Sequence, residues 1–278
     1  MNAATGAMTA SASRRPLALI TGASAGIGAA FARAYAARGY DLALSARRTE
    51  RLEALAAELA AAHGITAFAV PADLADFEAH AKVMAAVAAR GRVVDVLVNN
   101  AGFSIAQSFG AVPWERQRAF LMTLVVNACG LAYDVIPGMV ERGRGSIINV
   151  GSLAAFAPGV AGHSLYPGAK SLSVKFSQAL AAELKGTGVK VTVTCPGFTL
   201  TEFAEANGTK AVMDDAPRRF FQTAEAVVAT TLAANDKGQV VIVPGVHNKI
   251  AATMLRYLPE WLLIAVLSPA SAKYHLDE

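Results

Sequence analysis

A glycine-rich turn near the N-terminus has residue types that could bind a phosphate. The sequence TGASAGIG carries Gly22, Gly26 and Gly28 and runs straight into an alanine-rich helical segment at 29–38. Glycine allows a tight turn and close backbone approach, and a helix N-terminus offers unpaired N–H groups to a phosphate. The spacing is GxxxGxG and not GxGxxG, but the turn follows the first predicted strand. This position predicts a site for the pyrophosphate of a dinucleotide.

Two arginines indicate which dinucleotide binds. The second predicted strand ends in LSARR, where a site for NAD(H) would usually carry an acidic residue for the ribose 2′-hydroxyl. Arg47 and Arg48 follow instead, and a guanidinium can form charge-assisted hydrogen bonds to a 2′-phosphate. The sequence therefore favours NADP(H) over NAD(H). The alternative is that both arginines only form a solvated surface at the start of a helix.

Alternating strands and helices must position these residues. Segments with helical spacing lie between seven short apolar runs that predict strands, and this order predicts an α/β fold. We expect a Rossmann-type doubly wound parallel sheet of about seven strands, with helices on both faces. The predicted strands are Leu17–Thr21, Asp41–Ser45, Thr66–Val70, Val94–Val98, Ser146–Val150, Lys190–Thr194 and Gln239–Val243.

The domain organisation is equally simple. A disordered tail at 1–15 is expected to precede a single domain at 16–278, because no linker-like stretch follows Pro16. The long polar stretch at 198–222 lies between a strand and the next helix and predicts a substrate lid. Residues 246–278 form an apolar C-terminal extension.

Composition and charge exclude several classes of protein. The chain has 278 residues, of which 54% are hydrophobic and 17% charged, as expected for a folded chain. Its net charge of +4 is scattered, which argues against a nucleic-acid partner. Cys129 and Cys195 cannot form a disulfide framework, the five histidines show no metal-ligand spacing, and the N-terminus lacks a signal peptide's apolar core. We therefore expect a cytoplasmic protein without a metal. We also expect no membrane span, because charges and a proline interrupt the apolar stretch at 250–267.

Three further motifs carry a family resemblance. NNAG at 99–102, YPGAK at 166–170 and PGFTLT at 196–201 follow the glycine turn in order. With them the sequence resembles a classical short-chain dehydrogenase/reductase from about Pro16 to Gly245. The resemblance implies an NAD(P)-dependent oxidoreductase that acts on the CH–OH or C=O group of a small molecule. It also implies a homodimer or homotetramer.

The resemblance implies the following site residues. The catalytic tetrad would be Asn127, Ser152, Tyr166 and Lys170. Asn127 would hold a water that reprotonates Lys170, and Lys170 would also bind the nicotinamide ribose. The phosphate-binding turn would comprise Gly22, Ser24, Gly26, Ile27 and Gly28. Asp73 would contact the adenine; Asn99, Ala101 and Gly102 would support the sheet and pass beside the adenosine ribose; and Pro196, Gly197, Thr199 and Thr201 would orient the nicotinamide carboxamide.

Physical chemistry gives the Tyr166–Lys170 spacing a meaning of its own. Residues four apart share one face of a helix, and an ammonium near a phenol lowers its pKa from about 10. Tyr166 could then donate a proton to a carbonyl, or accept one from an alcohol, near neutral pH. Ser152 follows a predicted strand, at the edge where ligands of open α/β sheets gather, and could hold the substrate oxygen.

Two features depart from the family pattern. Ser152 and Tyr166 lie 14 positions apart, one more than is usual in the family. Pro167 follows Tyr166 directly, which disfavours helical backbone angles at Tyr166, although proline is tolerated in the first turn of a helix. The helix is therefore predicted to begin around Pro167.

Other interpretations stay open. A dinucleotide-binding sensor or scaffold without chemistry would carry the same fold. The C-terminal apolar residues could pack on the core, on another subunit or on a membrane surface; they are Leu255, Leu258, Trp261, Leu262 and Leu263. An apolar or aromatic substrate is predicted from five residues near the expected pocket, which are Phe103, Leu153, Phe156, Phe198 and Phe203.

Overall fold

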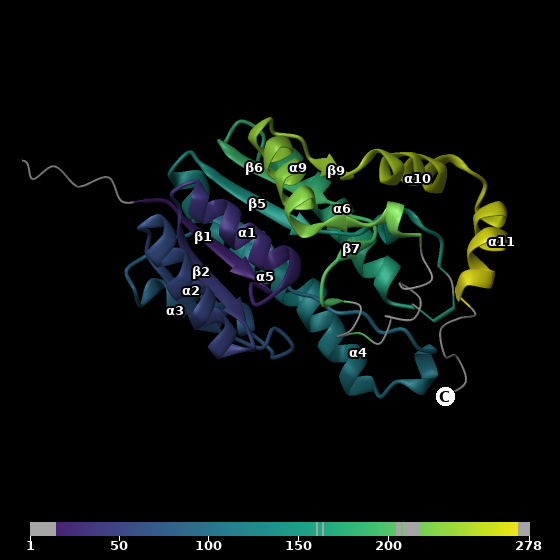
Figure 1. Cartoon of the computed structure of the whole chain (residues 1–278), viewed down its shortest axis with the longest axis horizontal. Coiled ribbons are helices and arrows are strands. Elements are labelled where there is room, and N and C mark those ends of the chain that lie inside the picture. Colours follow the sequence, from purple (N-terminus) through teal and green to yellow (C-terminus); the bar gives the residue numbers. More distant parts are fainter. Residues whose placement is uncertain (1–14, 160, 163, 204–206, 208–216, 272–278) are drawn as a thin grey trace, which may run out of the picture.

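A seven-stranded parallel sheet forms the centre of the computed structural model, which describes residues 15–159, 161, 162, 164–203, 207 and 217–271 (Figure 1). The strand order is β3-β2-β1-β4-β5-β6-β9. The strands are β1 (Leu17–Thr21), β2 (Asp41–Ala46), β3 (Ala67–Pro71), β4 (Val96–Asn99), β5 (Gly145–Val150), β6 (Val189–Thr194) and β9 (Val241–Ile242). Each overlaps its predicted range, so the predicted fold class is confirmed. The predicted tail lies outside the described residues except for Arg15.

Helices cover both faces of the sheet (Figure 1). On one face lie α1 (Gly26–Ala37), α2 (Thr49–His63) and α9 (Ala224–Asp236), and on the other α3 (Ala79–Ala88), α5 (Asn127–Glu141) and α6 (Tyr166–Glu183). Ala18 and Ile20 of β1 pack into the first core, whereas Leu17 and Leu19 pack into the second. Side chains alternate across a strand, so a strand buried on both faces must be apolar throughout.

The strand order reverses between β1 and β4. β1 pairs in parallel with β2 on one side and with β4 on the other. Ligands of open α/β sheets bind beyond the carboxyl ends of the strands at such a switch point. β1 leads into the glycine turn there, β4 into NNAG and β5 into Ser152.

One long helical run reaches the face of the sheet that α3 and α6 also cover. It consists of α4 (Trp114–Leu121), a π-helical turn η2 (Met122–Val126) and α5. Within the described part of the chain, this run is the one helix long and apolar enough to cross a membrane, by length and composition alone. Of its most apolar 18-residue window, 44% is buried inside the fold, and α5 packs on α3, β4 and β5.

The predicted lid is bracketed by a small sheet. β7 (Thr199–Leu200) pairs with β8 (Gln222–Thr223), and the Phe198 ring stacks on Phe221 at 5.5 Å between centroids. A 3₁₀ turn, η4 (Arg218–Phe220), precedes β8. These contacts hold the two ends of the segment together. Residues 204–206 and 208–216 lie outside the described residues, so the lid stays a prediction.

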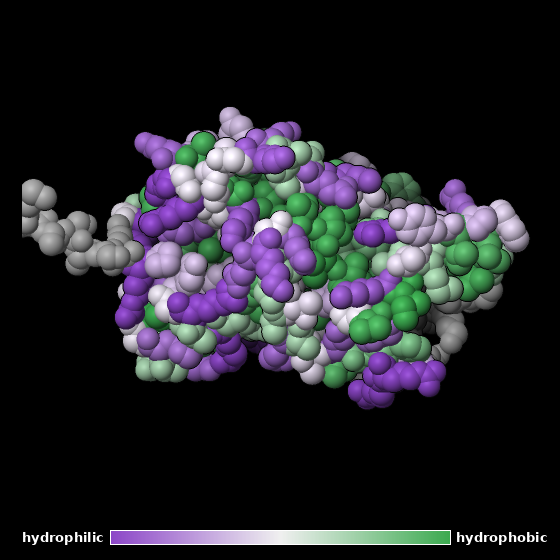
Figure 2. Space-filling model, turned by 90° about the horizontal axis from the view of Figure 1, so that it is seen from above, coloured by the Kyte–Doolittle hydropathy of each residue, from purple (hydrophilic) through white to green (hydrophobic). Residues whose placement is uncertain are grey.

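The C-terminal extension forms two helices, α10 (Val246–Tyr257) and α11 (Glu260–Ser271). α10 packs on a 3₁₀ turn, η3 (Leu153–Phe156), that follows Ser152. Figure 2 shows apolar surface at the end of the molecule that these two helices form. Of the face predicted from sequence, Trp261 and Leu258 are exposed but Leu263 is buried. The extension therefore turns part of its predicted face inward.

Candidate active site

The ends of β5 and β6 form the floor of the site. The Gly151 N–H donates to the Thr194 carbonyl at 2.7 Å, and the Leu153 N–H donates to the Pro196 carbonyl at 2.9 Å. Between them, Ser152 caps η3, because its Oγ accepts a hydrogen bond from the Ala154 N–H at 3.1 Å. The two strands therefore stay paired past their formal ends and fix the Ser152 backbone.

Tyr166 and Lys170 reach this floor from α6. The helix begins at Tyr166 with a proline in its first turn, as Pro167 predicts. Tyr166 is hydrogen-bonded to Ser152. The Lys170 ammonium is buried, donates to the Val150 carbonyl at 2.8 Å and lies 5.7 Å from the centre of the Tyr166 ring. Three of the four predicted catalytic side chains are thus brought together.

Burial dominates the electrostatics of the floor. It raises the pKa of Tyr166 above its ordinary value of 10, and the hydrogen bond with Ser152 only partly opposes this shift. Burial also lowers the pKa of Lys170 to about 8. The predicted lowering of the Tyr166 pKa is not seen in this structure, because loss of water raises that pKa. Cys195 lies beside Ser152, and burial raises the pKa of its thiol to about 11.

The Asn127 side chain is hydrogen-bonded to the connection between β3 and α3. Its Nδ2 donates to the carbonyls of Leu74 and Asp76, both at 2.9 Å, and its Oδ1 accepts from the His80 N–H at 2.9 Å. The fully buried carboxamide thus holds the connection between β3 and α3. These three bonds use both of its N–H donors. The structure gives Asn127 a structural role, and the water relay to Lys170 stays a prediction.

The glycine turn has the shape that a pyrophosphate requires. Gly22 and Gly26 have φ of +65° and +55°, and a Cβ on Gly28 would lie 2.2 Å from the Gly22 carbonyl oxygen. α1 begins at Gly26 with no side-chain cap and no acidic residue in its first turn, so its N-terminal N–H groups can bind an anion. Ile27 packs on the core behind the turn. The residues present therefore fit a dinucleotide.

The NNAG motif supports this turn from β4. The Asn100 Nδ2 donates to the carbonyls of Thr21 and Gly22 at 2.9 and 3.2 Å. Asn99 points inward and donates to the Ala128 carbonyl and to Asn149, both at 3.0 Å. Asn99 thus holds the sheet together, which is half of its predicted role. Ala101 and Gly102 follow it at the edge of the sheet, and their contact with the ribose stays a prediction.

The PGFTLT segment lies against the glycine turn. A Cβ on Gly26 would come 3.1 Å from the side chain of Thr201. Thr199 donates from Oγ1 to the Gly197 carbonyl at 3.1 Å, and a Cβ on Gly197 would lie 2.3 Å from Asn248 of α10. The segment predicted to contact the nicotinamide is therefore wedged between the phosphate turn and α10. Pro196 ties its start to η3.

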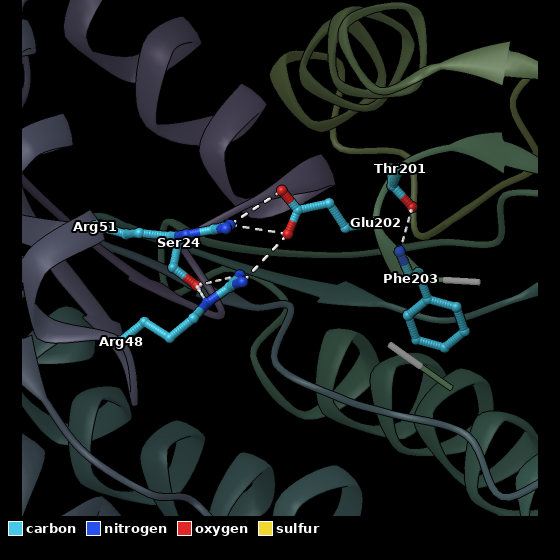
Figure 3. A network of polar contacts seen from close by, with 6 residues as sticks. All are labelled: Ser24, Arg48, Arg51, Thr201, Glu202 and Phe203. Atoms are coloured by element: carbon cyan, nitrogen blue, oxygen red, sulfur yellow. Dashed lines mark hydrogen bonds and ion pairs between the residues drawn. The ribbon is translucent and has the colours of Figure 1, made fainter. Parts of the chain in front are cut away.

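Charged side chains form an exposed edge beside the glycine turn (Figure 3). Arg48 donates from Nε and Nη2 to Ser24 Oγ at 3.2 and 3.0 Å, and from Nη1 to Glu202 at 3.2 Å. Arg51 donates to both Glu202 oxygens at 3.0 and 2.9 Å. Hydrogen bonds from Arg48 and then Arg51 hold the pKa of Glu202 below its usual value.

Arg47 and Asp73 are less firmly placed on this edge. Their side chains lie 4.0 Å apart, and 74% of the Arg47 side chain is exposed. Asp73 accepts a hydrogen bond from the Ala75 N–H at 3.0 Å. Sequence reasoning missed Arg51 and Glu202. The spacing of Arg48 and Arg51 puts them on one face of α2 and could have indicated Arg51, whereas no local signal indicates Glu202.

The model of a known family, described as short chain dehydrogenase, matches residues 16–211. The chain belongs to the short-chain dehydrogenase family. Membership confirms the predicted family and the enzyme class, an NAD(P)-dependent oxidoreductase. α9, α10 and α11 lie beyond the matched residues.

Individual relatives agree with this assignment. The NADP-dependent 3-hydroxy acid dehydrogenase YdfG of Salmonella typhi is 39% identical over 194 residues, which cover 67% of this chain and 74% of that protein. A short-chain dehydrogenase from Sphingobium yanoikuyae, solved in complex with NADPH, is 34% identical with a TM-score of 0.74 over 84% of this chain and 89% of that chain. A 7β-hydroxysteroid dehydrogenase structure reaches a TM-score of 0.81 at 27% identity, over 91% and 96% of the two chains.

Proposed function

We propose that this short-chain dehydrogenase interconverts a carbonyl and a secondary alcohol of a small apolar molecule with NADP(H), using Tyr166 as general acid and base. The hydrogen bond between Ser152 and Tyr166 above the buried Lys170 carries this proposal. Two hydroxyls that converge at the carboxyl edge of a parallel sheet can both bind one substrate oxygen.

Each residue then has a defined task. Bound NADP(H) supplies or removes the hydride. During reduction, Ser152 holds the carbonyl oxygen and Tyr166 gives its phenolic proton to that oxygen; during oxidation, Tyr166 takes the proton back. Lys170 holds the floor in place through the Val150 carbonyl and presents its ammonium beside the Tyr166 ring.

The cofactor preference is supported by two independent observations. Arg48 lies on Ser24 of the phosphate turn, with Arg47 next to it on the same edge, so both can reach a 2′-phosphate. A relative is named as NADP-dependent, and a related structure holds NADPH. We therefore assign NADP(H) in preference to NAD(H).

Apolar side chains on both sides of Tyr166 and Ser152 support an apolar substrate. On one side Phe120 lies 6.4 Å from the Tyr166 ring and packs edge-on against Phe103. On the other side Leu153 and Phe156 pack with Cys195. Apolar walls with few polar groups favour a ligand that is apolar around its reacting oxygen. Phe198 and Phe203, also predicted near the pocket, are both exposed.

The assembly and location follow the family resemblance. We propose a cytoplasmic homodimer or homotetramer, since symmetric dimers and tetramers are common in this family and closed symmetry is usual for soluble oligomers. Light scattering of the purified protein measures the oligomeric state directly.

A panel of ketones, aldehydes and secondary alcohols, assayed with NADPH or NADP⁺ and with NADH or NAD⁺, tests the function. The absorbance of the reduced nicotinamide reports turnover. We expect turnover of apolar ketones or alcohols, with the phosphorylated cofactor preferred. Binding of NADPH without turnover of any compound would instead support a dinucleotide-binding sensor or scaffold.

A further inference from the structure

One carboxylate holds two arginines at the edge of the glycine turn (Figure 3). Glu202 follows β7, whereas Arg48 and Arg51 lie at the start of α2, 154 and 151 residues away in sequence. Arg51 donates to both oxygens of Glu202, and Arg48 donates to one of them. This contact joins the substrate side of the molecule to the edge where the 2′-phosphate is expected.

The charges of this group do not balance. Two guanidinium cations share one carboxylate, so a net positive charge remains. A phosphate monoester carries between about −1.5 and −2 charges near neutral pH and has three acceptor oxygens. It could therefore satisfy both arginines more completely than Glu202 does.

The geometry leaves a phosphate access to the arginines. Arg48 is anchored by two hydrogen bonds to Ser24 of the phosphate turn, which leaves Nη1 for Glu202. A hollow of about 250 Å³ opens beside Arg51 and is also lined by Ser24 and by the ion pair of Arg33 and Glu58. Half of the Glu202 side chain is exposed, and exposed ion pairs of this kind contribute at most ~1 kcal/mol. Glu202 can therefore leave without unfolding its surroundings.

We propose that Glu202 occupies the donor groups of Arg48 and Arg51 that bind the 2′-phosphate of NADP(H), so that the phosphate and Glu202 compete for them. Arg51 is then a further phosphate-binding residue, and Glu202 sets cofactor selectivity. The inference rests on the proposed use of NADP(H). Binding of the phosphorylated cofactor releases Glu202 from the arginines, whereas NADH leaves Glu202 on them.

The variant Glu202→Gln tests the competition, because glutamine keeps the size of the side chain and removes its charge. The probes are 2′,5′-ADP and 5′-AMP, which differ only in the 2′-phosphate, with binding measured by calorimetry. We expect Glu202→Gln to lower the Kd for 2′,5′-ADP about 5- to 10-fold and to leave the Kd for 5′-AMP within about twofold. Arg51→Ala should raise the Kd for 2′,5′-ADP alone.

Glu58→Gln is the matched control. This substitution changes the net charge by the same amount. Glu58 lines the same hollow, but its carboxylate is paired with Arg33 and not with Arg48 or Arg51. Equal tightening of 2′,5′-ADP binding in both Gln variants would reduce the effect to net charge and overturn the inference. Weaker binding of 2′,5′-ADP to Glu202→Gln would also overturn it, because Glu202 would then assist the phosphate.

The wild-type protein separates this inference from the proposed function. If wild type prefers 2′,5′-ADP over 5′-AMP but Glu202→Gln does not change that preference, the cofactor assignment stands and the competition is wrong. If wild type shows no preference for 2′,5′-ADP, both are wrong.

Discussion

Charged side chains are held in place differently in two regions of the molecule. One region is the floor of the site, formed by the ends of β5 and β6, and the other is the exposed edge beside the glycine turn. In the floor, Lys170 is only 8% exposed and its ammonium is fixed by a backbone carbonyl. On the edge, the side chains of Arg48 and Glu202 are about half exposed and are held by other side chains. Burial shifts proton affinities and allows one geometry, whereas exposed pairs are weak and can exchange partners. The floor is therefore suited to acid–base chemistry. The edge is suited to exchanging the Glu202 carboxylate for the 2′-phosphate of a cofactor.

The largest effect is expected in the floor, from Tyr166→Phe, which removes only the titrating hydroxyl. General acid–base groups contribute about 10²- to 10⁴-fold in rate, so kcat should fall by that factor. The Kd for NADPH, measured by cofactor fluorescence, should change less than twofold. Turnover within twofold of wild type would remove Tyr166 from the mechanism.

The buried ammonium predicts a pH-dependent stability. The folded-state pKa of Lys170 is about 8 and its ordinary value is 10.5, so between these values the unfolded chain binds the proton more tightly. The contribution of Lys170 to the free energy of unfolding should therefore rise with pH from 8 towards 10.5, by up to roughly 3 kcal/mol. Denaturant unfolding of wild type and Lys170→Met between pH 7 and pH 10 measures the difference.

The control for this measurement lies on the same helix. Lys175 is exposed on α6, and the stability difference between wild type and Lys175→Met should stay constant over the same pH range. A constant difference for Lys170→Met as well would contradict a desolvated Lys170.

On the exposed edge, Arg48→Ala should act on cofactor recognition alone. Losing a charge-assisted contact to the 2′-phosphate costs about 1.5–3 kcal/mol, which corresponds to roughly a 10- to 100-fold rise in KM for NADPH. The KM for NADH should stay within twofold, and the difference should shrink as salt is added. Arg47→Ala should have a smaller effect, because Arg47 is the more exposed of the two. An equal rise of both KM values for Arg48→Ala would show general electrostatics instead of phosphate recognition.

The smallest effect of a substitution is expected at an exposed ion pair that lies away from the cofactor site. Arg38 and Asp236 join α1 to the end of α9 at 3.0 Å. Arg38→Ala should lower the free energy of unfolding by less than ~1 kcal/mol and leave both KM values unchanged. A change in either KM would mean that exposed pairs far from the cofactor also set recognition.

The sheet could be predicted from sequence because its strands are buried on both faces and therefore read as continuous apolar runs, as in β1. The joint position of Ser152, Tyr166 and Lys170 was predictable from motifs, and Pro167 correctly indicated the start of α6. The hydrogen bonds of the Asn127 side chain with the connection between β3 and α3 were not predictable, because they join residues about 50 positions apart in sequence.

Two other features also needed the structure. The pKa of Tyr166 depends on how completely the fold excludes water, which residue spacing does not report. The contact of Glu202 with Arg48 and Arg51 joins exposed residues far apart in sequence, and neither hydrophobic pattern nor local spacing carries information about it.

The most direct test compares kcat/KM with NADPH to kcat/KM with NADH. The ratio of the two values is measured for wild type, Tyr166→Phe and Arg48→Ala on one substrate. It tests whether chemistry belongs to the floor and phosphate recognition to the edge. We expect Tyr166→Phe to lower both values by the same large factor and to keep the wild-type ratio. Arg48→Ala should reduce the ratio about tenfold or more with little change in kcat. A ratio that changes in Tyr166→Phe, or stays at the wild-type value in Arg48→Ala, would contradict the assignment of chemistry to the floor and phosphate recognition to the edge.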